Sequence, residues 1–216
     1  MKKYYFFFMF CCLRSEAQID IGFQLSNFTI KNNFNKAKLL SANGFSTTFN
    51  IFKRLDKNVL LGTGFNSNFN KFVIDGIFFK RNAELVFEPN DNTIKNSYIN
   101  FNSISVPLKF KFLLFETEKG SDLFINFGGY AEYLFSTEQN YKKFDVEKIE
   151  KIRLDRNTLF GLNIDYGMNF AITKERKILF ANGFSYQLTS FLRNGNSFNP
   201  LNIYLKLAMT INTSKD

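Results

Sequence analysis

Residues 201–212 read LNIYLKLAMTIN, and this stretch decides how the rest of the chain is interpreted. Its odd-numbered positions are all large and apolar, whereas its even-numbered positions are mostly polar or small. Because successive side chains of a β-strand point to opposite faces, the stretch predicts a strand with one apolar and one polar face. Twelve residues extend roughly 40 Å, enough to cross an apolar layer of ~25 Å at a tilt of ~45°. The stretch therefore indicates a membrane-spanning strand of a β-barrel.

Seven further segments alternate in the same way, which predicts eight strands in total. The connections between the strands alternate strictly between long and short. Outer-membrane barrels combine long external loops with short periplasmic turns. The predicted fold class is therefore all-β: a transmembrane antiparallel up-and-down β-barrel with both termini periplasmic. The seven segments are 19–29, 44–53, 58–69, 98–115, 122–135, 157–172 and 177–190; the long connections are 30–43, 70–97, 136–156 and 191–200, and the short ones are 54–57, 116–121 and 173–176.

Two places depart from the regular pattern. Residues 71–88 contain apolar runs around Asp75-Gly76, a dipeptide that is favoured in hairpins. They could form a hairpin above the membrane or an extra pair of strands making ten, and the charged residues among them favour eight. Pro107 lies inside the fourth strand, where a closed barrel offers no edge position for its missing N–H. We therefore expect a bulge or a local break at Pro107.

The N-terminus predicts export. Two lysines precede an apolar run at residues 4–13, which is too short to cross a bilayer as a helix. Ser15 and Ala17 then place small residues where a signal peptidase reads them. We predict a cleaved signal peptide at residues 1–17, a barrel domain at 18–216 and a location in the bacterial outer membrane. Cleavage would remove both cysteines, and with them any disulfide or thiolate metal site, and would lower the formal net charge from +9 to +7.

Composition excludes several kinds of chemistry. The chain contains no His, which removes Ser-His-Asp triads and imidazole metal sites. We predict no enzymatic activity, no cofactor and no metal site. The basic residues are scattered and interleaved with acidic ones, so we expect no nucleic-acid partner. The expected partners are outer-membrane lipid, lipopolysaccharide and envelope proteins that contact the external loops.

Six charged residues fall on the polar faces of the predicted strands and therefore in the lumen. An eight-stranded barrel has an interior just wide enough for its own side chains. Charges that are buried there without partners carry a heavy desolvation cost. We interpret the six as a structural network of ion pairs and hydrogen bonds, and the alternative is a narrow conduction path or a small-ligand site. They are Asp20, Lys109, Lys111, Glu132, Asp165 and Lys206.

Several short motifs resemble the PorT-like outer-membrane β-barrel family of Bacteroidetes. Residues 105–111, SVPLKFK, are similar to a strand with a -Pro-Leu-(Leu)-Lys- core in that family. The chain also matches in the FGGY element at 127–130, the Gly-containing strand at 161–167, the SYQLT segment at 185–189 and the final alternating strand. The resemblance covers most of the mature chain. It implies an eight-stranded barrel and no defined activity.

The leading functional hypothesis is a small integral outer-membrane barrel with a structural, adhesive or envelope-assembly role and a side-chain-filled lumen. One alternative is a secreted soluble barrel that binds an apolar ligand, as lipocalins do, and another is a narrow pore. The lipocalin-like alternative needs the apolar faces inside and a charged exterior. Gly, Ser, Asn and Thr prevail on the polar faces, as expected for a crowded lumen. The charged loop at 140–156 is either a solvated surface or a cationic patch that contacts polysaccharide.

Overall fold

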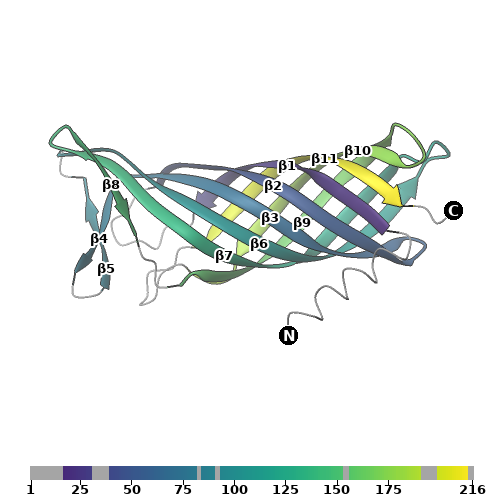
Figure 1. The fold of residues 1–216 in the computed structure, drawn as a ribbon, viewed down its shortest axis with the longest axis horizontal. Helices are drawn as coiled ribbons and strands as arrows, with labels where there is room; N and C mark the ends of the chain where they lie inside the picture. Colours follow the sequence, from purple (N-terminus) through teal and green to yellow (C-terminus); the bar gives the residue numbers. More distant parts are fainter. Residues whose placement is uncertain are drawn as a thin grey trace.

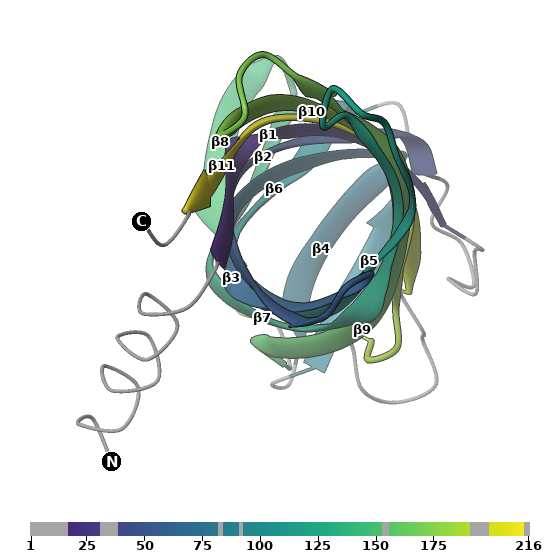
Figure 2. The same ribbon diagram turned by 90° about the vertical axis from the view of Figure 1, so that its right-hand side faces the viewer.

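The computed structural model describes residues 17–30, 39–81, 84–90, 93–152, 156–190 and 199–213. Eight of its strands lie side by side, each antiparallel to its neighbours, and the last pairs with the first to close a ring (Figures 1 and 2). The predicted all-β antiparallel barrel of eight strands is confirmed. In ring order the strands are β1 (Ala17–Ile30), β2 (Leu39–Asp56), β3 (Val59–Ile74), β6 (Ile94–Glu116), β7 (Asp122–Lys143), β9 (Thr158–Ala171), β10 (Arg176–Gln187) and β11 (Pro200–Thr213).

The first and last strands close the barrel without a register shift. Pairing runs from Ala17 opposite Thr213 to Ile30 opposite Pro200. The Thr213 hydroxyl also lies 3.0 Å from both the backbone N and the backbone O of Ala17. Residues 1–16 lie outside the described part of the chain, and with them almost all of the predicted signal peptide. Within the described residues no helix has the length and apolar character needed to cross a membrane.

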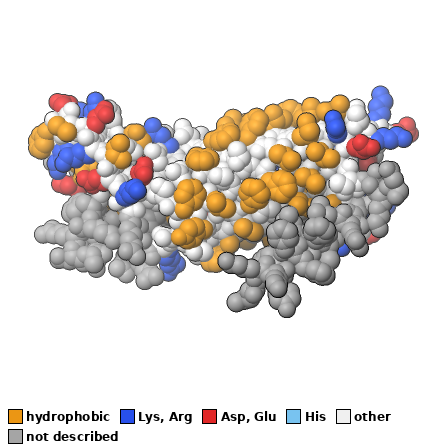
Figure 3. All heavy atoms as spheres, in the orientation of Figure 1, with side chains coloured by type: hydrophobic (Ala, Val, Ile, Leu, Met, Phe, Trp, Pro, Cys, Tyr) orange, Lys and Arg blue, Asp and Glu red, His pale blue; other side chains and the backbone are white. Residues whose placement is uncertain are grey.

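The alternation of β11 translates directly into two environments. Leu205 is 61% exposed on the outside, whereas its neighbour Lys206 is only 5% exposed and faces the lumen. The same alternation of exposed apolar and buried polar side chains holds around the ring. Apolar side chains therefore form a belt over the outer surface, while charged side chains gather at the two ends (Figure 3). An exposed apolar belt of this extent is expected where lipid covers it. The orientation is the reverse of that required by a lipocalin-like barrel.

The strands are longer on the external side than the sequence pattern predicts. β6 contains 23 residues and β7 contains 22, whereas β10 contains 12. The segments 94–97 and 136–143, which we expected to be loop, continue these two strands as a paired ribbon. Beyond the apolar belt both faces of a strand meet water or protein, so the alternation that marks a strand in the sequence fades there while the backbone pairing continues.

Three short strands complete this end of the molecule. β4 (Gly76–Arg81) and β5 (Glu84–Pro89) form a separate two-stranded sheet, so residues 71–88 add no strands to the ring. Asp75-Gly76 is not the turn of this hairpin but the corner between β3 and β4, where Gly76 has φ +139° and a side chain would overlap the backbone oxygen of Glu88. β8 (Val146–Lys151) lies within the predicted loop 140–156 and pairs with the end of β7.

Pro107 produces a local break without an inserted residue. Thr63 pairs with Leu108 and Asn66 pairs with Ser105, so the β3–β6 register is the same on both sides. The two β6 positions between these pairs, 106 and 107, have no ladder partner in β3. The Thr63 hydroxyl donates to the Pro107 carbonyl at 2.9 Å, which ties the strands together where the proline N–H is missing. The expected bulge is therefore not present at this position.

Candidate functional site

The lumen contains all six of the charged residues that the sequence places there. It also contains Asp122 and Lys177, which are 3% and 7% exposed and which sequence reasoning missed. They are the first residues of the predicted strands 122–135 and 177–190, next to the predicted short turns. Their inward position follows the same alternation as Asn126 and Leu179 farther along their strands. Continuing the alternation to the ends of the strands would have identified them.

Asp165 is the centre of the best-connected group in the lumen. Its Oδ2 lies 3.1 Å from Lys109 Nζ and accepts a hydrogen bond of 3.1 Å from the Tyr204 hydroxyl. Its Oδ1 accepts from the side-chain amide of Asn126. Asp165 is 1% exposed, so in the folded protein an ammonium and two neutral donors replace the water that would otherwise surround its carboxylate.

A second ion pair lies nearer the short turns. Lys177 Nζ is 2.6 Å from Asp122 Oδ2 and 3.9 Å from the Glu116 carboxylate. The amide of Asn169 donates to Asp122 Oδ1 at 2.6 Å. The pair is thus built from β7, β9 and β10, three consecutive strands of the ring.

Asp20 is held differently. It accepts hydrogen bonds from the Thr210 hydroxyl at 2.7 Å and from the Gln18 amide at 2.9 Å. Lys111 and Lys206 act on it electrostatically, although neither forms an ion pair within the described residues. The Lys111 ammonium lies 4.3 Å from the centre of the Phe124 ring, a cation–π distance. The structure therefore brings five of the six predicted charges into one region but joins only Lys109 and Asp165 directly.

Glu132 lies apart from these lysines. Its Oε1 accepts hydrogen bonds from the Ser103 hydroxyl and, at 3.0 Å, from the Asn68 amide. No ion pair reaches Glu132 from any described lysine or arginine. Of the six predicted residues it is therefore the one that the structure leaves outside the basic cluster.

Glu132 borders a cavity of about 80 Å³ in the external half of the lumen. Its lining is mostly uncharged and polar, and Lys109 and Glu132 are the charged residues that contribute to it. Tyr130 and Tyr204 form part of the wall, each with its ring stacked over a glycine of the adjacent strand, where a methyl group would overlap the ring. The other uncharged polar residues of the lining are Gln24, Ser26, Ser46, Asn66, Asn68, Asn70, Ser105, Asn163, Ser185, Gln187 and Asn202.

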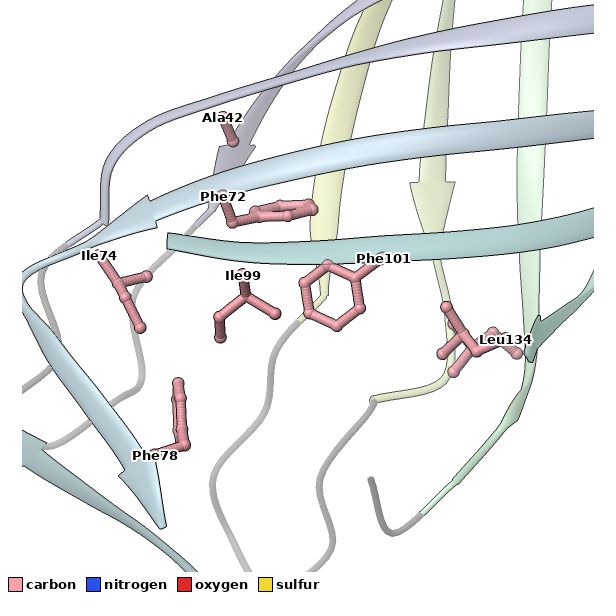
Figure 4. Close-up of a cluster of buried hydrophobic side chains, with 8 residues drawn as sticks. Ala42, Phe72, Ile74, Phe78, Ile99, Phe101 and Leu134 are labelled. Atoms are coloured by element: carbon pink, nitrogen blue, oxygen red, sulfur yellow. The ribbon is translucent and has the colours of Figure 1, made fainter. Parts of the chain in front are cut away.

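An apolar cluster covers the cavity on its external side (Figure 4). Along β6 the inward residues run from Lys111 and Lys109 through Ser105 at the cavity to Phe101 and Ile99 in the cluster. Phe72, Phe101 and Leu134 belong to both the cavity wall and the cluster. The buried members of the cluster are Ala42, Phe72, Ile74, Phe78, Ile99, Phe101, Leu134 and Leu159.

One glutamine attaches the β4–β5 hairpin to this cluster. Gln139 of β7 is fully buried, and its side-chain amide pairs with the backbone of Phe78 in β4. Phe78 N donates to Gln139 Oε1 at 2.7 Å, and Gln139 Nε2 donates to Phe78 O at 3.1 Å. The Phe78 ring packs against Phe87 with 5.1 Å between the ring centres. The hairpin is thus attached to the barrel mouth by this amide pair and by the place of Phe78 in the apolar cluster.

This arrangement fits a structural interior better than a reactive one. The described residues contain no group of three or more His, Cys, Asp or Glu side chains placed to hold a metal ion. The lumen carboxylates accept hydrogen bonds from amides and hydroxyls or pair with lysines. The external cavity brings polar groups and open space together in the lumen.

Comparison with known proteins finds similarity in fold alone. OprG from Pseudomonas aeruginosa is 8% identical, with a TM-score of 0.48 over 93% of this chain and 97% of that one. Neisserial surface protein A (NspA) is 12% identical, with a TM-score of 0.45 over 90% and 96%. Ail, the attachment invasion locus protein of Yersinia pestis, is 13% identical, with a TM-score of 0.42 over 91% and 99%.

No family model and no curated protein sequence matches the chain. The architecture therefore rests on the features of the molecule itself. These are a closed antiparallel ring of eight strands, a polar lumen and an apolar outer belt with charged ends. In lipid every backbone polar group must be paired within the protein, and a closed barrel satisfies this requirement with strands. The protein has the architecture of a bacterial outer-membrane β-barrel.

Proposed function

We propose that this protein is a non-conducting outer-membrane barrel that presents an adhesive sheet at the cell surface. The observation that carries the proposal is the contrast between a filled lumen and a structured external extension. Ion pairs and the apolar cluster occupy the lumen, whereas β6, β7 and β8 continue as a paired sheet beyond the belt (Figure 1). We further propose, on the SVPLKFK motif, that the chain is a member of the PorT-like family.

The tip of the extension presents apolar side chains between charged ones. Phe144 and Ile149 are each 72% exposed, and Val146 is 59% exposed. Phe144 and Asp145 form the two-residue turn between β7 and β8, with φ angles of 51° and 61°. Such turns favour Asn-Gly, because a bulky residue is strained at positive φ. A strained and exposed phenylalanine at the outermost turn supports a role in contact.

The charges at the tip suggest the chemistry of the partner. Lys95 pairs with Asp145 and Lys142 pairs with Glu147, whereas Lys148 has no ion pair within the described residues. We propose that the tip contacts an anionic glycolipid or polysaccharide surface, for which lipopolysaccharide is the probe. Lys148 would meet its anionic groups, and Phe144 and Ile149 would meet apolar or sugar-ring surfaces.

Two experiments test the proposal. The first concerns location and conductance. We expect heat-modifiable migration of the protein from an outer-membrane fraction and no steady conductance in planar bilayers. Recovery as a soluble periplasmic protein, or stable channel openings, would refute the proposal.

The second experiment concerns adhesion, and it tests the binding of proteoliposomes to immobilised lipopolysaccharide. The double variant Phe144→Ser and Ile149→Ser should reduce binding at least fivefold. Leu55→Ser, which changes a residue 56% exposed near a short turn, is the matched control and should bind as the wild type does.

A further inference from the structure

The four carboxylates in the described lumen are not equally compensated. Asp165 and Asp122 form ion pairs with lysines, and Lys111 and Lys206 act on Asp20. Among the described residues, Glu132 has only the neutral donors Ser103 and Asn68. A buried carboxylate without a cationic partner carries a large desolvation cost, so a positive charge beside it would be strongly favoured.

Amide oxygens without partners line the same cavity. Asn202 is 7% exposed and its Nδ2 donates to Ser26 Oγ at 3.2 Å, while its buried Oδ1 has no hydrogen-bond partner among the described residues. In the same part of the chain the buried Oδ1 of Asn66 also has none. Both residues belong to the cavity wall together with Glu132. An amide oxygen can only accept, so what these atoms lack is a donor or a cation.

A continuous polar strip joins Asn66 to Glu132. The Asn66 amide donates to Ser105 Oγ at 3.2 Å, and the Asn68 amide lies 3.4 Å from the same oxygen. The Asn68 amide also donates to Glu132 at 3.0 Å. In these hydrogen bonds the amides of Asn66 and Asn68 are both donors, and they share Ser105 Oγ as an acceptor. The Asn66 amide therefore donates within the strip, whereas its Oδ1 accepts no hydrogen bond from the described residues.

We propose that this cavity is a binding site for a small hard cation, with the Glu132 carboxylate as its charged ligand and the Asn66 and Asn202 amide oxygens as neutral ligands. Carboxylate, amide and water oxygens are the ligands that Ca²⁺ prefers. The cavity, about 80 Å³ in volume, has room for such an ion together with water molecules. With one carboxylate, affinity falls in the weak range of about 10⁻⁴–10⁻³ M that extracellular calcium sites show.

The experiment uses the refolded, chelator-treated barrel in detergent, with Tb³⁺ as a luminescent probe and Ca²⁺ as its competitor. Tyr130 and Tyr204 line the cavity and would sensitise Tb³⁺ emission if the ion binds there. Glu132→Gln keeps the side-chain volume and should weaken the Ca²⁺-competed signal at least tenfold. Glu147→Gln is the matched control, because Glu147 is 79% exposed in β8 and should leave the signal unchanged.

A second variant keeps the test decisive if Glu132→Gln does not refold. Asn66→Asp places another carboxylate beside the same space and should tighten Ca²⁺ binding at least fivefold, with heat-modifiable migration as the check on folding. Absence of Ca²⁺-competed emission in the wild type would overturn the proposal. So would equal loss of the signal in Glu132→Gln and Glu147→Gln, or an Asn66→Asp variant that binds no more tightly than the wild type.

Discussion

The lumen of this barrel holds carboxylates in two different environments. One environment contributes to the stability of the fold, and the other leaves a carboxylate able to bind a ligand. On the short-turn side of the cavity, Asp165 and Asp122 each meet a lysine within 3.1 Å and a neutral amide donor. In the external half, Glu132 meets neutral donors and open space. A carboxylate that is fully paired contributes to the folded state, whereas one that is partly satisfied can still bind something.

The largest expected effect comes from breaking the paired half. Asp165→Asn removes the charge that compensates Lys109 and leaves a buried ammonium without its partner. We expect the free energy of unfolding to fall by about 3–5 kcal/mol, measured by urea titration in detergent or vesicles. Asp145→Asn is the control, because the Lys95–Asp145 pair is exposed and should contribute less than about 1 kcal/mol. Equal effects of the two substitutions would contradict the structural role of the lumen pair.

Lys206→Met should have an intermediate effect. The ammonium is 5% exposed and acts on Asp20 and Asp165, but each of these keeps another lysine nearby. We expect a loss of about 2 kcal/mol in unfolding free energy and no change in bilayer conductance. A variant with wild-type stability and altered conductance would assign Lys206 to a conduction path instead.

Gln139→Ala tests the cover of the external half. It deletes both side-chain hydrogen bonds to the buried Phe78 backbone. We expect a cost of about 1–2 kcal/mol that is confined to the β4–β5 hairpin. Hydrogen exchange should therefore accelerate in residues 76–81 and stay at the wild-type rate in β11, and uniform acceleration throughout the barrel would show that the hairpin is not an independent unit.

Glu132→Gln should have the smallest effect when no cation is present. The amide keeps an acceptor oxygen for Ser103 and Asn68 and removes an uncompensated buried charge. In the presence of a chelator we expect a change of less than about 1 kcal/mol in unfolding free energy, in either direction. A loss as large as that of Asp165→Asn would show that the two halves of the lumen do not differ in the way described above.

Much of the barrel could be predicted from the sequence because lipid imposes a simple rule. Wherever a strand crosses the apolar belt, its outer face must be apolar and its inner face polar, so residues 201–212 reveal their structure by alternation alone. The same rule placed Lys109, Lys111 and Lys206 in the lumen. Outside the belt the rule no longer applies, which is why β8 and the outer parts of β6 and β7 were expected to be loops.

The sequence by itself determined which side chains face lipid and which face the lumen, because that choice depends only on position along a strand. Only the tertiary structure decided which lumen groups meet. Strand register brings Lys109 to Asp165, and the length of β7 brings Gln139 to the β4 backbone. Register and tilt arise from the closing of all eight strands at once, and no local pattern encodes them. For this reason Glu132 could be placed in the lumen from the sequence, but its separation from every described lysine could not.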